Sequence, residues 1–121
     1  MNPFHTLLKR IEQQIRFEEE EMDSEHPPNY RDQLKRSVRK EQWLNLKRWL
    51  EDSLTRPTSL TSLEQEIDRY IFARETDFFD MLDDIRVRRG YSPVSGLEMY
   101  SSAIQKEQLY LMKAWIHESR D

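Results

Sequence analysis

Three aspartates, Asp77, Asp80 and Asp84, have the spacing that places oxygen ligands on one face of a helix. Intervals of three and four residues bring side chains to the same side of an α-helix, and Asp83 lies beside them. Carboxylates gathered in this way can hold a hard cation or form a paired acid and base. A single helix face offers no loop to wrap an ion, and the sequence has no Glu-x-x-His motif to complete a site. We therefore interpret these aspartates as a solvated polar face, and predict no metal site and no cofactor.

The three histidines, His5, His26 and His117, lie far apart in the sequence. None has the carboxylate or histidine neighbour, three or four residues away on a helix, that a helical metal site uses. Asp23 precedes His26 by three residues, but the segment around it is a predicted linker, where spacing fixes no geometry. Two isolated glycines cannot build a phosphate-binding loop, and no serine or threonine lies in a nucleophile-elbow context. The sequence therefore predicts that the protein is not an enzyme.

A basic segment follows an acidic one. Residues 1–27 hold three basic and seven acidic side chains, whereas residues 28–56 hold eight basic and four acidic ones. On a helix, the cations of the second segment share one broad face with an aromatic side chain, and this face consists of Lys35, Arg36, Arg39, Lys40, Trp43 and Lys47. Such a face can bind phosphates and stack a base. It can equally pair with the acidic end of the first segment or with the acidic third segment in the same fold.

The overall charge favours the second interpretation. The formal net charge is −4 and the isoelectric point is near 5.5, whereas a domain dedicated to nucleic acid is usually basic. We therefore expect the basic face to be paired within the fold, and keep a nucleic-acid partner as the alternative.

Composition predicts an all-α protein. The 121 residues suit a single domain spanning 1–121, and 35% of them are charged. Only two glycines and five prolines occur, and helix-forming residues dominate. There is no cysteine for a disulfide framework, no apolar run that approaches a membrane span, and no apolar core of a signal peptide. These features predict a cytoplasmic protein that does not bind membranes.

Helix-capping and helix-breaking residues along the chain predict four helices. We expect helices over residues 3–22, 29–54 and 63–89, and a fourth that begins near Ser92 or Ser95 and ends near Ser119. Asn29 is a good N-cap, and Thr61 with Glu64 has the spacing of a capping box. Four acidic residues, 18–21, oppose the helix macrodipole and predict fraying at the end of the first helix. Short linkers join the helices, so the expected architecture is an elongated antiparallel bundle or two helical hairpins.

The third predicted helix carries the longest apolar stripe. Its members recur at intervals of three and four residues over about seven turns, and they are Leu63, Ile67, Tyr70, Ile71, Phe78, Met81, Leu82 and Ile85. We expect this stripe to be core, with Phe78 buried. Arg74 occupies a stripe position, so either its stem lies along apolar surface with the guanidinium at the edge, or it pairs with a carboxylate between helices.

The end of the fourth helix is apolar almost all round. Residues 109–116 are nearly all apolar, and one bundle seam covers only part of a helix. Either this end lies in the middle of the bundle, or it forms a partner interface made of Leu109, Tyr110, Met112, Trp115 and Ile116. Surplus apolar surface without a reactive site predicts a small regulatory or adaptor protein that acts by binding a protein partner, as a homodimer across this patch.

Overall fold

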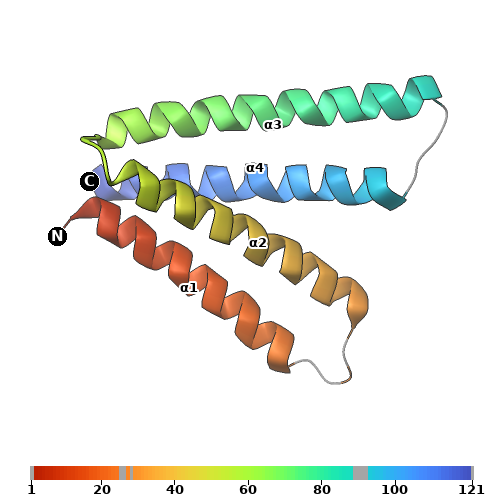
Figure 1. Ribbon diagram of the computed structural model, residues 1–121, viewed down its shortest axis with the longest axis horizontal. Helices are drawn as coiled ribbons and strands as arrows, with labels where there is room; N and C mark the ends of the chain where they lie inside the picture. The colour runs from red at the N-terminus through yellow and green to blue at the C-terminus, as the bar shows by residue number, and fades with distance from the viewer. Residues whose placement is uncertain (1, 25–26, 28, 89–92, 121) are drawn as a thin grey trace.

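The structure is a computed structural model that describes residues 2–24, 27, 29–88 and 93–120. Its four helices are α1 (Pro3–Ser24), α2 (Tyr30–Ser53), α3 (Leu60–Arg88) and α4 (Pro93–Arg120), and the described residues contain no strand (Figure 1). The predicted all-α class and the two helical hairpins are confirmed. None of the described helices combines the length and the apolarity that spanning a lipid bilayer requires.

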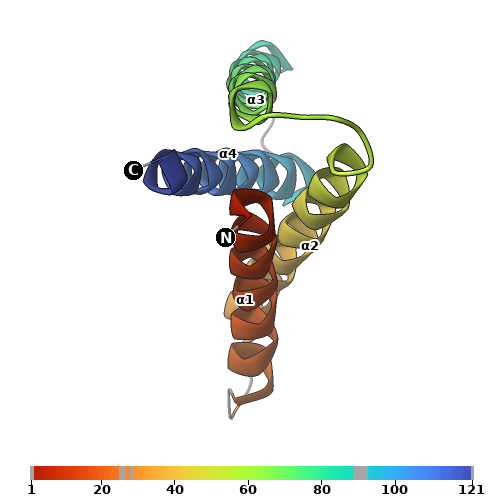
Figure 2. The ribbon, with the colours of Figure 1, turned by 90° about the vertical axis from the view of Figure 1, so that its left-hand side faces the viewer.

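The helices pack as two antiparallel hairpins, α1 with α2 and α3 with α4. The hairpins meet near the chain termini and diverge toward their linkers (Figure 1). Figure 2 shows that α4 lies between α3 and the α1/α2 hairpin. Helix α4 therefore contacts all three other helices, whereas α3 packs mainly against α4.

Helix α1 begins where the sequence predicts. Asn2 caps it through its side-chain oxygen, which accepts from the Phe4 backbone N–H at 2.9 Å, and Pro3 occupies the first helical position. The predicted fraying at its acidic end is wrong, because the helix continues to Ser24. Cations from α2 pair with this acidic run and offset the unfavourable interaction with the macrodipole.

The start of α2 is confirmed, and the start of α3 is corrected. The Asn29 side chain accepts from the backbone N–H groups of Arg31 and Asp32, as an N-cap does. The predicted capping box at Thr61 is wrong, because α3 already begins at Leu60 and the Ser59 hydroxyl oxygen accepts from the Ser62 N–H at 3.1 Å. Gly90, Ser92 and His26 lie outside the described residues.

The core lies where α4 crosses the other helices. It joins Leu7 and Ile11 of α1 and Leu50 of α2 to residues of α3 and α4, and all of these side chains are buried. On α2 and α4, Trp43 and Trp115 stack with ring centroids 5.6 Å apart. These contacts cluster where the two hairpins meet, so the core holds the hairpins together.

The apolar stripe of α3 is core only in its first half. Leu63, Ile67 and Ile71 are buried, but Tyr70 and Leu82 are exposed and Phe78 is only partly buried. The predicted burial of Phe78 is therefore wrong in degree. Beyond about Ile71 the hairpins have diverged, so α3 has α4 as its main neighbour and no second layer covers the stripe.

Candidate interaction surface

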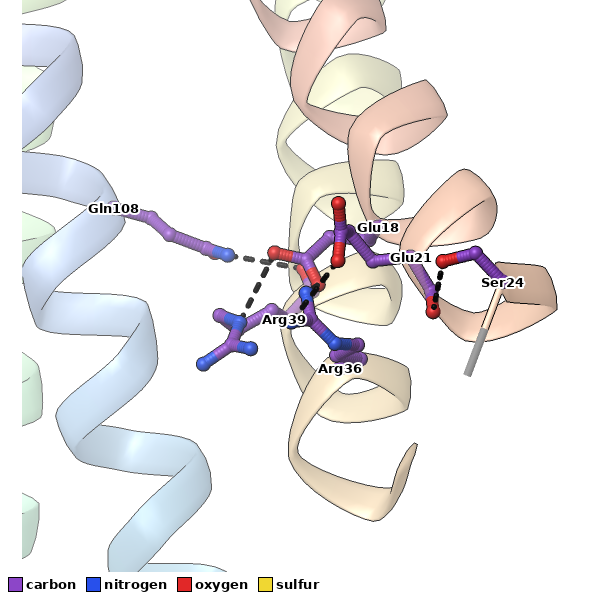
Figure 3. A network of polar contacts seen from close by, with 6 residues as sticks. All are labelled: Glu18, Glu21, Ser24, Arg36, Arg39 and Gln108. Atoms are coloured by element: carbon purple, nitrogen blue, oxygen red, sulfur yellow. Dashed lines mark hydrogen bonds and ion pairs between the residues drawn. The ribbon is translucent and has the colours of Figure 1, made fainter. Parts of the chain in front are cut away.

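The basic face of α2 is turned toward α1. Glu18 of α1 is buried, with only 5% of its side chain exposed, and it receives two arginines (Figure 3). The Arg36 Nη1 atom lies 3.2 Å from one carboxylate oxygen and the Arg39 Nε atom lies 3.1 Å from the other. Glu21 also pairs with Arg36, at 3.7 Å. Both oxygens of the buried acid are satisfied by charge-assisted hydrogen bonds, which fix the register of α1 against α2.

The other members of the basic face are engaged in the same way. Lys40 pairs with Glu19 at 3.3 Å, and Lys47 pairs with Glu12 at 3.7 Å. The Lys35 ammonium lies 5.9 Å from the centre of the Tyr100 ring of α4, and Trp43 is buried in the core. The expected intramolecular pairing of this face with the end of α1 is therefore present, and Trp43 offers no ring on which a base can stack.

A third helix contacts this network. The buried Gln108 side chain of α4 donates from Nε2 to the backbone oxygen of Arg39 at 2.9 Å (Figure 3). Its Oε1 atom is buried and has no hydrogen-bond partner among the described residues. The amide therefore connects α4 to the same turn of α2 that binds Glu18.

The apolar end of α4 is mostly internal. Leu109, Met112, Trp115 and Ile116 are buried within the chain, in contact with α1, α2 and α3. Of the five residues predicted as a partner interface, only Tyr110 is exposed. The other four have no surface left for a partner in this fold, because α4 is the central helix and is covered on several sides.

The candidate metal ligands do not assemble. Among the described residues, no group of three or more histidine, aspartate or glutamate side chains is arranged to hold a metal ion. Asp77 pairs with Arg74, and Asp83 pairs with Arg86 at 2.7 Å. His117 lies 3.5 Å from Glu64 on the surface, and His5 is exposed.

A cleft opens between the diverging hairpins. It has a volume of about 310 Å³ and is lined by Gln42, Asn45, Leu46 and Trp49 of α2, Tyr70 and Arg74 of α3, and Gln105 and Leu109 of α4. The Trp49 and Tyr70 rings meet edge to face, and both donate to the Glu66 carboxylate at 3.4 Å. Burial, and then the neighbouring Glu66 charge, raise the pKa of the Tyr70 phenol above its ordinary 10.0.

Arg74 heads a chain of polar contacts across the floor of this cleft. Its Nη2 atom pairs with Asp77 of the same helix at 2.9 Å, and its Nη1 atom donates to the Gln105 side-chain oxygen at 2.9 Å. The Gln105 amide in turn donates to Gln42 at 2.6 Å. Of the two interpretations of Arg74, pairing with a carboxylate agrees better with the structure. The carboxylate is that of Asp77 on the same helix, whereas the contact to α4 is made with the Gln105 amide. The two amides thus bond to each other, and Gln105 also accepts from Arg74, so these polar groups are satisfied within the protein.

Comparison with known proteins does not suggest a function for the chain. No protein family, curated protein or solved structure matches the chain. The candidate site therefore depends on exposure, charge and geometry alone.

The most exposed aromatic pair of the described residues lies on α3. Phe72 is 72% exposed and Phe79 is 63% exposed, and seven residues place them on one side of the helix, two turns apart. Figures 1 and 2 show α3 at the outside of the molecule, and it packs mainly against α4. Between and beyond them lie exposed residues at helical spacing, and together they form the outer face of α3: Asp68, Arg69, Phe72, Thr76, Phe79, Asp83 and Arg86. Asp68 lies at the edge of this face, where its carboxylate accepts from the Lys113 ammonium of α4 at 2.8 Å.

Sequence reasoning missed this face because it followed the longer stripe. Phe72 and Phe79 lie about 110° around α3 from the buried Ile67 and Ile71, at 100° per residue. The available signal was a second stripe with intervals of three and four, weak because only two of its seven members are large and apolar. An exposed aromatic pair within a charged surface is typical of a binding site rather than of random surface composition.

Proposed function

We propose that this protein acts by binding another protein chain through the outer face of α3. The observation that carries the proposal is the exposure of Phe72 and Phe79 on one side of a helix that packs mainly against a single neighbour. Covering two phenylalanine rings removes a large apolar area from water, and aromatic side chains are the usual anchors of protein interfaces.

Charged residues surround the aromatic pair. Asp68 and Arg69 lie one turn before Phe72, and Asp83 and Arg86 lie one to two turns after Phe79. A polar rim around an apolar centre is the ordinary anatomy of a protein interface. The presence of both acids and bases favours a protein surface with both charges over the uniformly anionic backbone of a nucleic acid.

The nucleic-acid alternative receives less support. Arg36, Arg39, Lys40 and Lys47 pair with acids of α1, so binding a phosphate would require breaking those ion pairs. The predicted cytoplasmic location stays a prediction, and so does the prediction that the protein is not an enzyme.

Photo-crosslinking in the native cell tests the proposal. A benzophenone amino acid in place of Phe79 should form a covalent adduct with a protein chain on illumination. The same probe in place of Tyr30 is the control, because Tyr30 is 80% exposed and lies on α2 rather than on α3. Adducts from position 79 that disappear with the additional change Phe72→Ser support the proposal. Equal adducts from positions 79 and 30, or none from position 79, contradict it.

A further inference from the structure

The outer face of α3 has a charge pattern that changes sign when it is read from the opposite end. Its N-terminal end carries the acid and base Asp68 and Arg69, and its C-terminal end carries Asp83 and Arg86. Each end is neutral and offers one cation and one anion. All four belong to exposed residues; Asp68 also pairs with Lys113 of α4 at 2.8 Å, and Arg86 pairs with Asp83 at 2.7 Å.

The phenylalanine pair and the pair Arg69 and Asp83 have their centres within half a residue of each other, and the centre of the pair Asp68 and Arg86 lies one residue further on. The midpoint of Phe72 and Phe79 falls between residues 75 and 76, that of Arg69 and Asp83 falls at residue 76, and that of Asp68 and Arg86 falls at residue 77. When two identical helices pair antiparallel, a residue on one faces its mirror position about such a centre on the other. Each aromatic ring would then meet the other aromatic ring of the pair, and Arg69 of each copy would meet Asp83 of the other.

We propose that the partner of the outer face of α3 is a second copy of this chain, packed antiparallel about a two-fold axis near Thr76. The inference rests on the proposed function, because it names the partner for the same face. A face that complements itself in both ring position and charge fits an isologous contact, in which the same patch serves both subunits.

Thr76 suits a position on the two-fold axis. It is small, and its hydroxyl donates to the Phe72 backbone oxygen at 3.0 Å, so no unsatisfied polar group is buried when a second helix covers it. A small residue there lets two helix axes approach to about 8–10 Å, with the two phenylalanines of each copy on either side. From Arg69 to Arg86 the face extends about 25 Å at 1.5 Å per residue, enough for a five-turn helix pair.

Charge reversal with mixing tests the contact and its direction. Arg69→Asp places two acids at each of two symmetric positions in a homodimer, and Asp83→Arg places two bases there. Each variant alone should raise the dissociation constant of the dimer about tenfold, the effect of turning two exposed attractive pairs into repulsive ones. An equimolar mixture should recover the parent's dissociation constant, because both contacts between unlike variants are attractive.

The measurement is light scattering coupled to size exclusion over a concentration series, set against the 14.8 kDa chain mass. The chain has no cysteine, so Ser37→Cys on α2 allows one variant to be labelled and the mixed dimer to be followed by fluorescence anisotropy. Arg48→Asp is the matched control, because Arg48 is an exposed arginine on α2 and its reversal should leave association unchanged. Circular dichroism melts check that every variant folds.

The outcomes separate this inference from the function on which it rests. Weakened single variants with recovery in the mixture support a second copy in the antiparallel arrangement. Weakened single variants without recovery overturn that arrangement. A parent that stays monomeric at every concentration overturns the second copy as partner. In that case, crosslinking from position 79 to a different protein would leave the proposed function standing. If position 79 forms no crosslink either, the proposed function is contradicted as well.

Discussion

The indole rings of Trp43 and Trp115 lie nearly parallel, 17° apart in plane, with their centroids separated by 5.6 Å. One ring comes from α2 and the other from α4, so the stack is a direct contact between the two hairpins. The Arg10 guanidinium of α1 lies 5.5 Å from the centre of the Trp115 ring and places a cation against it. Three helices thus meet at one aromatic pair, and we expect the stability of the whole fold to depend on it.

Replacing Trp115 by alanine should lower the free energy of unfolding by about 3–5 kcal/mol, the usual cost of emptying a buried aromatic site. Trp43→Ala should cost a similar amount. Tyr30→Ala is the control and should stay within about 0.5 kcal/mol, because that ring is exposed. Urea denaturation followed by circular dichroism measures all three. Trp115→Glu should unfold the chain, and a folded monomer from that variant would contradict the internal position of the ring.

The predictable parts of the fold are those whose causes lie close together in the sequence. Helix class and the Asn29 cap depend on residues within one turn, and both appear as predicted. The fraying predicted for residues 18–21 failed because its remedy is not local: the cations that stabilise those acids come from α2. Both charged segments are evident in the sequence, so a pairing between them was predictable. The individual residues that pair were not.

The candidate site was harder to predict, for a geometric reason. Periodicity shows which residues share a face, but not how far along a helix its neighbour extends. The stripe through Ile71 and Phe78 is continuous in sequence, yet the hairpins diverge along it and the burial declines. The apolar end of α4 posed the reverse problem, because an all-round apolar helix fits both a central position and an interface. Only the packing of α4 among the other three helices shows that Trp115 and Ile116 are core residues.

Glu18→Gln should lower the free energy of unfolding by about 1–3 kcal/mol, because hydrogen bonds to a charged group are lost from a buried position. Glutamine keeps the shape of the side chain but cannot accept from Arg36 and Arg39 with both of its terminal atoms. Glu20→Gln, an exposed position in the same acidic run, should change it by less than about 0.5 kcal/mol. Equal effects of the two changes in urea melts would show that the ion-pair network contributes nothing specific.

The purified protein should show no appreciable binding to single-stranded or double-stranded DNA or RNA at low salt. The reason is that the cations of α2 are already paired with acids of α1. Electrophoretic mobility shifts and fluorescence anisotropy with labelled oligonucleotides measure this. Binding that falls steeply with salt, and disappears when Lys35, Arg36, Arg39 and Lys40 are changed to Gln, would instead restore the nucleic-acid alternative.

Substitutions on the buried and on the exposed side of α3 should have different effects on stability and on association. Ile67→Ala removes a fully buried side chain and should cost about 2–5 kcal/mol in the free energy of unfolding. Phe79→Ser removes an exposed ring and should cost less than about 1 kcal/mol, while it weakens any complex formed through the outer face. Urea melts and light scattering on the same samples give both quantities. A large loss of stability with Phe79→Ser would mean that this ring belongs to the core.

Alkaline pH should loosen the α3/α4 hairpin. The Tyr110 hydroxyl donates to Glu75 at 3.1 Å, and this hydrogen bond raises the pKa of the phenol above its ordinary 10.0. The Lys113 ammonium donates to Asp68 at 2.8 Å, which raises the pKa of Lys113 above 10.5. In both cases the protonated form makes the contact in the folded state. Stability from a raised pKa is present below the unfolded-state value and is lost as pH rises through the folded-state value.

The free energy of unfolding should therefore be steady through neutral pH and fall as the pH rises above about 10. Tyr110→Phe removes one of the two contacts and one of the titrating groups, so the decline should become shallower in that variant. Tyr30→Phe is the matched control: its hydroxyl belongs to a highly exposed ring on α2, and its removal should leave the decline unchanged. Urea midpoints measured at a series of pH values give the comparison. A parent whose stability is flat across the alkaline range, or rises there, would contradict the assigned contacts between Tyr110 and Glu75 and between Lys113 and Asp68.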